Sequence, residues 1–173
     1  MRHSGWVPLL AVVGLLVGGC GSSPQSGTPS GVGDASGVDM CTILTNAELS
    51  GLGIDPGSRE QVDELGVVGC QWVGQPIRLS LERDEDPVAE YVARRDDPAF
   101  KSFRENTVNG RAAAQLSVRR GGEQCVQLID GGPVSLAVAV GQAFSRGPVE
   151  VDPCAEALRI AEMIEPRLPK AGT

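Results

Sequence analysis

Histidine is nearly absent from this sequence, and the absence narrows the chemistry that the protein can perform. The only histidine among the 173 residues is His3. Because no histidine follows His3, the rest of the chain cannot perform Ser-His-Asp or Cys-His catalysis and cannot form a histidine-ligated zinc or iron site. The chain also lacks a Gly-rich phosphate loop, a Rossmann fingerprint and a Ser-x-x-Lys motif. We therefore expect no catalytic residues, no metal site and no cofactor, and we interpret the protein as non-enzymatic.

Basic residues are outnumbered, and aromatic residues are few. There are 15 Lys and Arg against 22 Asp and Glu, which gives a formal net charge of −7. Nucleic acids bind clustered Lys and Arg, so no nucleic-acid partner is expected. Four of the six aromatic rings could line a groove for a partner, although the packing of a helix on a sheet is the interpretation we favour. These rings belong to Trp72, Tyr91, Phe100 and Phe103.

The one long apolar run lies near the N-terminus. It extends from Trp6 to Val17, twelve residues, whereas a permanent membrane span needs roughly 18 or more. Arg2 precedes it, and Val17-Gly18-Gly19-Cys20 follows it, which resembles a bacterial lipobox. We expect residues 1–19 to be a cleaved signal peptide and Cys20 to carry the lipid that anchors the protein on the extracytoplasmic face of the cell membrane. An ordinary secretory signal with a chance cysteine is the alternative.

A polar linker separates this segment from the rest of the chain. Of the seventeen residues from Gly21 to Gly37, thirteen are Gly, Ser, Pro or Thr, a composition typical of a flexible tether. As a coil it would span roughly 20–25 Å. The sequence therefore predicts a lipidated tether over residues 20–37 and a single globular domain over residues 38–169.

Periodicity and capping residues predict the elements of this domain. Thr45 and Glu48 fit a capping box for a helix that ends at Gly53, and Asp152-Pro153 begins a C-terminal helix. That helix carries an apolar stripe of Cys154, Leu158, Ala161, Ile164 and Leu168. Between them, Pro87 to Asn106 is interpreted as helical with a break at Asp97-Pro98.

Alternating apolar residues predict the strands. The expected strands are Val68–Trp72, Ile77–Glu82, Val108–Val118, Glu123–Ile129 and Val134–Val140. Arg111 and Gln115 should face away from the apolar side of their strand. Gly121-Gly122 and Gly131-Gly132 supply hairpin turns. Because no βαβ alternation runs through this order, we predict an α+β fold with a mostly antiparallel sheet and helices packed on it.

Four cysteines remain after Cys20, and an exported domain would hold them as disulfides. Three pairings are possible. We favour Cys41–Cys70 and Cys125–Cys154, because each would tie the start of a helix to a strand across 29 residues. A four-cysteine zinc site is the competing interpretation, and the absence of a Cys-x-x-Cys pair disfavours it.

Carboxylates are the remaining candidates for chemistry. The densest run is Glu82, Asp84, Glu85 and Asp86. A glycosidase needs two carboxyl groups about 5–10 Å apart across a cleft. We interpret the run as a solvated loop, and we keep a carboxylate-only hydrolase of envelope glycans as an alternative.

Several short motifs together resemble a known family. They are Cys41–Thr45 followed by Glu48, Gly69–Trp72, and Asp152–Cys154 leading into a helix that ends at Leu168-Pro169. After a lipobox and a tether, they resemble the actinobacterial lipoproteins of the domain of unknown function 3558 family. The resemblance implies a PsbP-like α/β/α sandwich and a place in the cell envelope, and it carries over no catalytic residues.

The sequence thus favours a lipid-anchored envelope lipoprotein that acts as a binding or scaffold module. Its partner would be an envelope protein or a small apolar molecule. Besides the hydrolase, an inhibitor of a secreted hydrolase is a further alternative. It would insert a loop such as Gly53–Gly66 or Gly141–Pro153 into its target.

Overall fold

The computed structural model describes residues 32–118, 124–143 and 151–170. The predicted signal peptide, Cys20, most of the tether and the Gly121-Gly122 turn lie outside the described residues. The same holds for most of the Gly141–Pro153 segment.

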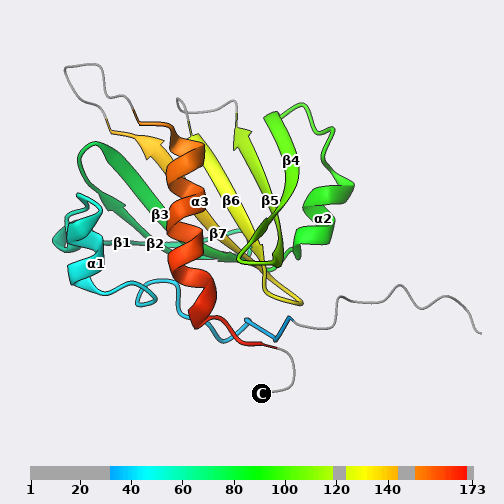
Figure 1. Ribbon diagram of the computed structural model, residues 1–173, viewed down its shortest axis with the longest axis horizontal. Helices are drawn as coiled ribbons and strands as arrows, with labels where there is room; N and C mark the ends of the chain where they lie inside the picture. Colours follow the sequence, from blue (N-terminus) through cyan, green and yellow to red (C-terminus); the bar gives the residue numbers. More distant parts are fainter. Residues whose placement is uncertain (1–31, 119–123, 144–150, 171–173) are drawn as a thin grey trace, which may run out of the picture.

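A seven-stranded sheet organises the domain, in the order β1-β2-β3-β7-β6-β5-β4 (Figure 1). Every pair of neighbouring strands is antiparallel, so the predicted α+β class is confirmed. The strands are β1 (Glu60–Glu64), β2 (Val67–Val73), β3 (Ile77–Asp84), β4 (Phe100–Val108), β5 (Arg111–Val118), β6 (Gln124–Asp130) and β7 (Ser135–Gln142).

Helices cover both faces of the sheet. The longest, α3 (Pro153–Ile164), crosses the front face in Figure 1, and α1 (Asn46–Gly51) lies at the β1–β2 end. The short helix α2 (Val88–Ala93) packs on the opposite face, over β5 and β6. Two 3₁₀ turns, η1 (Pro56–Ser58) and η2 (Glu165–Arg167), complete the described elements.

The helix ends follow the expected capping chemistry. The Thr45 side chain accepts from the Glu48 backbone N–H at 3.2 Å, and the Glu48 carboxylate accepts from the Thr45 backbone N–H at 2.8 Å. Gly53 then adopts a φ of +74°, which suits a residue without a Cβ at the end of α1. At α3, the Asp152 carboxylate accepts from the backbone N–H of Cys154 at 2.8 Å. Both predicted helix starts are confirmed.

Alternation along the strands divides the apolar residues into two cores. The larger core lies between the sheet and α3 and holds Trp72, Leu79, Leu81, Val138 and Ile160 among others. The smaller core lies beneath α2. It holds Val88, Ala114, Leu116, Leu128 and Ala137.

Both edge strands differ from the prediction. The helix expected through Asn106 ends at Ala93, and Phe100–Val108 is strand β4 instead. The segment Gly53–Gly66, expected as a long loop, contains η1 and strand β1. Each of these strands has only one neighbour in the sheet and carries many exposed polar residues, so neither shows an apolar alternation.

The fold also begins earlier than the predicted boundary at residue 38. Ala35 is fully buried, and its backbone N–H donates to the Gly131 carbonyl at 2.9 Å. Val32 forms an isolated antiparallel bridge with Lys170. Residues 32–37 therefore belong to the folded domain, because backbone pairing and one small apolar side chain compensate for a composition that is otherwise typical of a linker.

Arg111 is buried rather than solvent-facing. Its side chain is 4% exposed and pairs with Glu165, Nε to Oε1 3.0 Å. The guanidinium also donates to the carbonyls of Asp130 and Pro169, at 3.1 and 2.9 Å. These contacts attach the C-terminal segment to the sheet.

Candidate functional site

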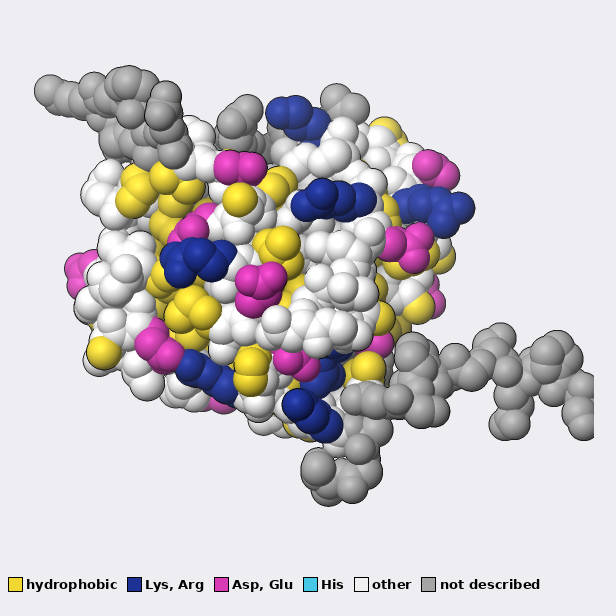
Figure 2. Space-filling view, viewed as in Figure 1, with side chains coloured by type: hydrophobic (Ala, Val, Ile, Leu, Met, Phe, Trp, Pro, Cys, Tyr) yellow, Lys and Arg dark blue, Asp and Glu magenta, His cyan; other side chains and the backbone are white. Residues whose placement is uncertain are grey.

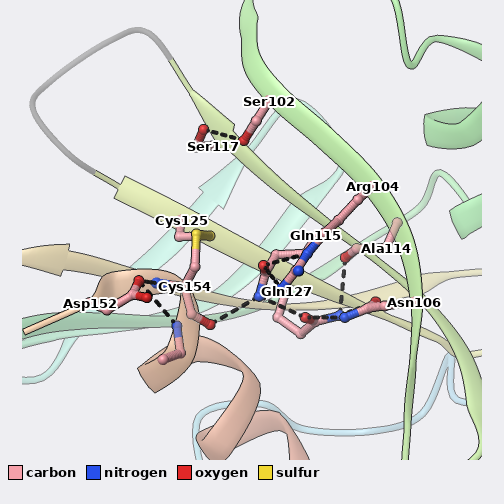
Figure 3. Close-up of a disulfide and its surroundings, with 11 residues drawn as sticks. Ser102, Arg104, Asn106, Ala114, Gln115, Ser117, Cys125, Gln127, Asp152 and Cys154 are labelled. Carbon is pink, nitrogen blue, oxygen red and sulfur yellow. Dashed lines mark hydrogen bonds between the residues drawn. A yellow bond between two sulfur atoms is a disulfide. The ribbon is translucent and has the colours of Figure 1, made fainter.

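Two disulfides attach flanking segments to the sheet. Cys41 is bonded to Cys70 in β2, and Cys125 in β6 is bonded to Cys154 in the first turn of α3. This is the pairing that the sequence favoured. The second disulfide fixes the N-terminal end of α3 over the sheet (Figure 3).

The four aromatic residues considered for a groove do not lie together. Trp72 is 2% exposed and belongs to the larger core on the α3 side. Tyr91, Phe100 and Phe103 pack against the smaller core on the other face. A single groove lined by all four rings is therefore wrong, because Trp72 and the other rings are on opposite faces of the sheet.

Two of the rings do border a cavity. Phe100 and Phe103 stack with ring centroids 5.8 Å apart. With Arg95, Asp97 and Lys101 they line a cavity of about 380 Å³ at the end of α2. A second cavity, of about 300 Å³, lies beside Cys41 and is bordered by Val38, Gln61, Val68 and Arg83 among others.

The acidic run Glu82, Asp84, Glu85 and Asp86 was interpreted as a solvated loop, but its first two residues lie in strand β3. Glu82 and Asp84 are half-buried on the α2 face of β3. Burial raises the pKa of Glu82, and the Ser80 hydroxyl donates to its carboxylate. The Tyr91 hydroxyl donates to Asp84 (Oδ2), and burial together with this bond raises the pKa of Tyr91. Neither cavity described above is lined by Glu82 or Asp84.

A polar face on the α3 side of β4, β5 and β6 forms a cluster of hydrogen-bonded side chains. We define it by six residues: Ser102, Arg104, Asn106, Gln115, Ser117 and Gln127. Antiparallel register places Ser102 opposite Ser117, Arg104 opposite Gln115, and Asn106 beside the β6 residue Gln127 across β5. Figure 3 shows these side chains next to the Cys125–Cys154 disulfide.

Hydrogen bonds connect the members of the polar face in pairs. The hydroxyls of Ser102 and Ser117 are 2.7 Å apart. Arg104 donates from Nε and Nη2 to Oε1 of Gln115, at 2.9 and 2.5 Å. The side-chain amides of Asn106 and Gln127 form two hydrogen bonds with each other, each 3.0 Å long. Each outer residue on β4 is thus held by a partner on an inner strand.

The inner residues are fixed by the protein interior. Gln127 is fully buried, and its Nε2 also donates to the Ala114 carbonyl at 3.1 Å. Gln115 is 4% exposed, and its Nε2 donates to the carbonyl of Cys154 at 2.9 Å. The disulfide holds Cys154 beside the sheet, so it indirectly orients Gln115 and, through it, Arg104.

The polar face suits recognition by hydrogen bonds. Amides, hydroxyls and one guanidinium offer donors and acceptors, and none of the six is a carboxylate or thiol. Figure 2, which views the α3 side, shows a largely neutral polar surface beside α3 over β4 and β5. Among the described residues, no group of three or more His, Cys, Asp and Glu side chains is placed to hold a metal ion.

Sequence reasoning missed this face because it interpreted part of β4 as helix. One signal for the strand was present. Asn109-Gly110 joins β4 to β5 with both residues at positive φ, +50° and +86°. Asn-Gly between two extended segments is the strongest short-range indication of a hairpin. A strand that leads into this hairpin has Ser102, Arg104 and Asn106 at alternate positions, and therefore on one face.

The family of the chain follows from its sequence. The family model described as "Protein of unknown function (DUF3558)" matches residues 15–167. The chain belongs to this family. This confirms the resemblance drawn from the cysteine and capping motifs, and the DUF3558 match includes all six residues of the polar face.

Comparison with curated proteins and with solved structures gave no match. The PsbP-like fold and the actinobacterial origin therefore stay predictions. In the part of the chain that the structure describes, no helix has both the length and the apolar character needed to cross a membrane.

Proposed function

We propose that this DUF3558 protein is a lipid-anchored, non-catalytic binding module of the cell envelope, with the polar face as its ligand-binding surface. The observation that carries the proposal is the row of paired amide, hydroxyl and guanidinium side chains on β4, β5 and β6. The residues on β4 reach solvent, and the buried side chains of Gln115 and Gln127 hydrogen-bond to two of them, Arg104 and Asn106.

Pre-organisation supports a binding role. A ligand that meets side chains already fixed by hydrogen bonds pays less ordering entropy on binding. Gln115 and Gln127 are fixed by buried contacts, and the Cys125–Cys154 disulfide fixes the helix that supplies one of these contacts. The lipobox and linker support the location, since they would present the domain outside the cell membrane.

Site-specific photo-crosslinking in intact cells tests the proposal. A photoreactive residue replaces Ser102, which is exposed on the polar face, in the full-length protein. The matched control replaces Glu90, which is exposed on α2 on the opposite side of the sheet. We expect a discrete adduct with an envelope component from position 102 and none from position 90. Adducts from position 90 alone, or from both positions equally, would overturn the proposal.

A carboxylate-only hydrolase of envelope glycans is the second candidate. It is favoured by the raised pKa of Glu82, which lies two residues from Asp84 on the same face of β3, because a carboxyl that keeps its proton can act as a general acid. This candidate requires turnover of an envelope glycan that is abolished by Glu82→Gln and unaffected by Glu162→Gln, an exposed position on α3. Metal-free turnover with this pattern would replace the binding proposal.

A further inference from the structure

Arg104 differs from most of the paired arginines of the described chain, because its partner is a side-chain amide and not a carboxylate. Five arginines contact a carboxylate: Arg94, Arg95, Arg111, Arg159 and Arg167. Arg104 instead donates to the amide oxygen of Gln115. An amide orients a guanidinium without neutralising its charge. The polar face therefore carries one fixed positive charge in a protein whose formal net charge is −7.

In the part of the chain that the structure describes, the strand neighbours of Arg104 on its own side of the sheet include no carboxylate. Its neighbours on β4 are Ser102 and Asn106, and those across on β5 are Ala113, Gln115 and Ser117. All five are uncharged. The next residue in the chain, Glu105, points to the opposite face, where it contacts Arg95 at 4.0 Å. None of these described neighbours neutralises the charge of Arg104.

The bonds to Gln115 also determine which edge of the guanidinium a ligand meets. Nε and Nη2 both donate to one oxygen, so this edge is occupied. The Nη1 hydrogens and the second Nη2 hydrogen form the other edge, which matches the two oxygens of a carboxylate or phosphate. Gln115 cannot turn away easily, because its own amide donates to Cys154 and Gln127, at 2.9 and 3.1 Å (Figure 3).

We infer that Arg104, with the paired hydroxyls of Ser102 and Ser117, is a subsite for the carboxylate or phosphate group of an anionic envelope glycan. The inference rests on the proposed function, that the polar face binds a ligand. Hydroxyl and amide side chains flank the charge at alternate positions of β4, roughly 7 Å to either side. They suit the hydroxyl groups of a sugar, whereas a protein partner would also need apolar side chains, which this face lacks.

Titration followed by NMR tests the subsite. The protein used is the mature chain with Cys20→Ser, in which both disulfides are intact and only the acylation site is removed. The probes are glucuronate, glycerol phosphate and glucose, at equal ionic strength. We expect the Arg104 Nε signal and the backbone amides of Ser102 and Ser117 to shift with one or both anions and not with glucose. The probe that binds more tightly identifies carboxylate or phosphate as the source of the charge.

Matched variants separate a binding role from a structural one. Arg104→Gln should weaken anion binding at least tenfold, because a charge-assisted bidentate contact is lost. Arg159→Gln removes the same charge from an exposed ion pair on α3 and should leave binding unchanged. Unchanged unfolding temperatures for both variants show that the fold is intact. No Arg104 response to either anion, or equal losses in the two variants, would overturn the inference.

The photo-crosslinking experiment separates failure of the subsite from failure of the proposed function. If position 102 still forms its adduct in cells while neither anion binds, the polar face binds a ligand but Arg104 is not an anion subsite. If position 102 forms no adduct, the proposed function itself fails.

Discussion

Replacing Arg111 with methionine should destabilise the domain more than any surface substitution. The change leaves the Glu165 carboxylate, 7% exposed, without the guanidinium that pairs with it at 3.0 Å. Removing one partner of a buried ion pair costs about 3–5 kcal/mol. Two hydrogen bonds to the carbonyls of Asp130 and Pro169 are lost as well. Domains of this kind are stable by about 5–15 kcal/mol in total, so the expected loss is a large fraction of the whole.

Urea unfolding of the oxidised protein measures this loss. The midpoint should fall by the equivalent of about 3–5 kcal/mol with an unchanged slope. Arg159→Met is the control, because it breaks an exposed pair with Glu156 and should cost less than about 1 kcal/mol. Adding Glu165→Leu to Arg111→Met should recover part of the loss, since no unpaired charge then remains buried. Equal effects of Arg111→Met and Arg159→Met would mean that the buried ion pair contributes no more to stability than the exposed one.

Three further predictions concern the disulfides and the titration of two carboxyls. Replacing both Cys125 and Cys154 with alanine should cost about 3.5 kcal/mol in urea unfolding, because the crosslink closes a 29-residue loop. Contact with Arg167 lowers the pKa of Glu48 from 4.5 to about 2, so its stabilising effect is present above pH 4.5 and is lost as the pH falls toward 2. In the Glu48→Gln variant, the free energy of unfolding should therefore depend less on pH between pH 4.5 and pH 2. Burial raises the pKa of Glu82, so ionisation there destabilises the fold as the pH rises, and Glu82→Gln should be more stable than the parent at pH 7 but not below pH 4.

The interior of the fold could be predicted from the sequence because its signals are local. Strands β2, β3, β6 and β7 alternate apolar and other residues, or are buried on both faces, and the Gly131-Gly132 turn joins the last two. The helices α1 and α3 begin at capping residues that bond as their types predict. In such segments, periodicity and capping chemistry agree with the tertiary structure.

The edges of the fold could not be predicted in this way. An edge strand has only one partner, and exposed charges on it protect against pairing with other chains. Strand β1 reads Glu-Gln-Val-Asp-Glu, and β4 contains Lys101, Arg104 and Glu105, so neither shows a hydrophobic period of two. Because strand β4 was not predicted, the polar face that it helps to form was not predicted either. The burial of Arg111 and Gln115 depends on where α3 crosses the sheet, which no local pattern encodes.

The proposed envelope role depends on export of the chain, cleavage before Cys20 and anchoring through Cys20. The decisive measurement is the intact mass and the N-terminal peptide map of the protein purified separately from the membrane and soluble fractions of its own cells. We expect a mature chain in the membrane fraction that begins at Cys20, carries a thioether-linked diacylglyceryl group and has no free thiol among its other four cysteines. A cytosolic protein that retains residues 1–19 and has four free thiols would contradict it.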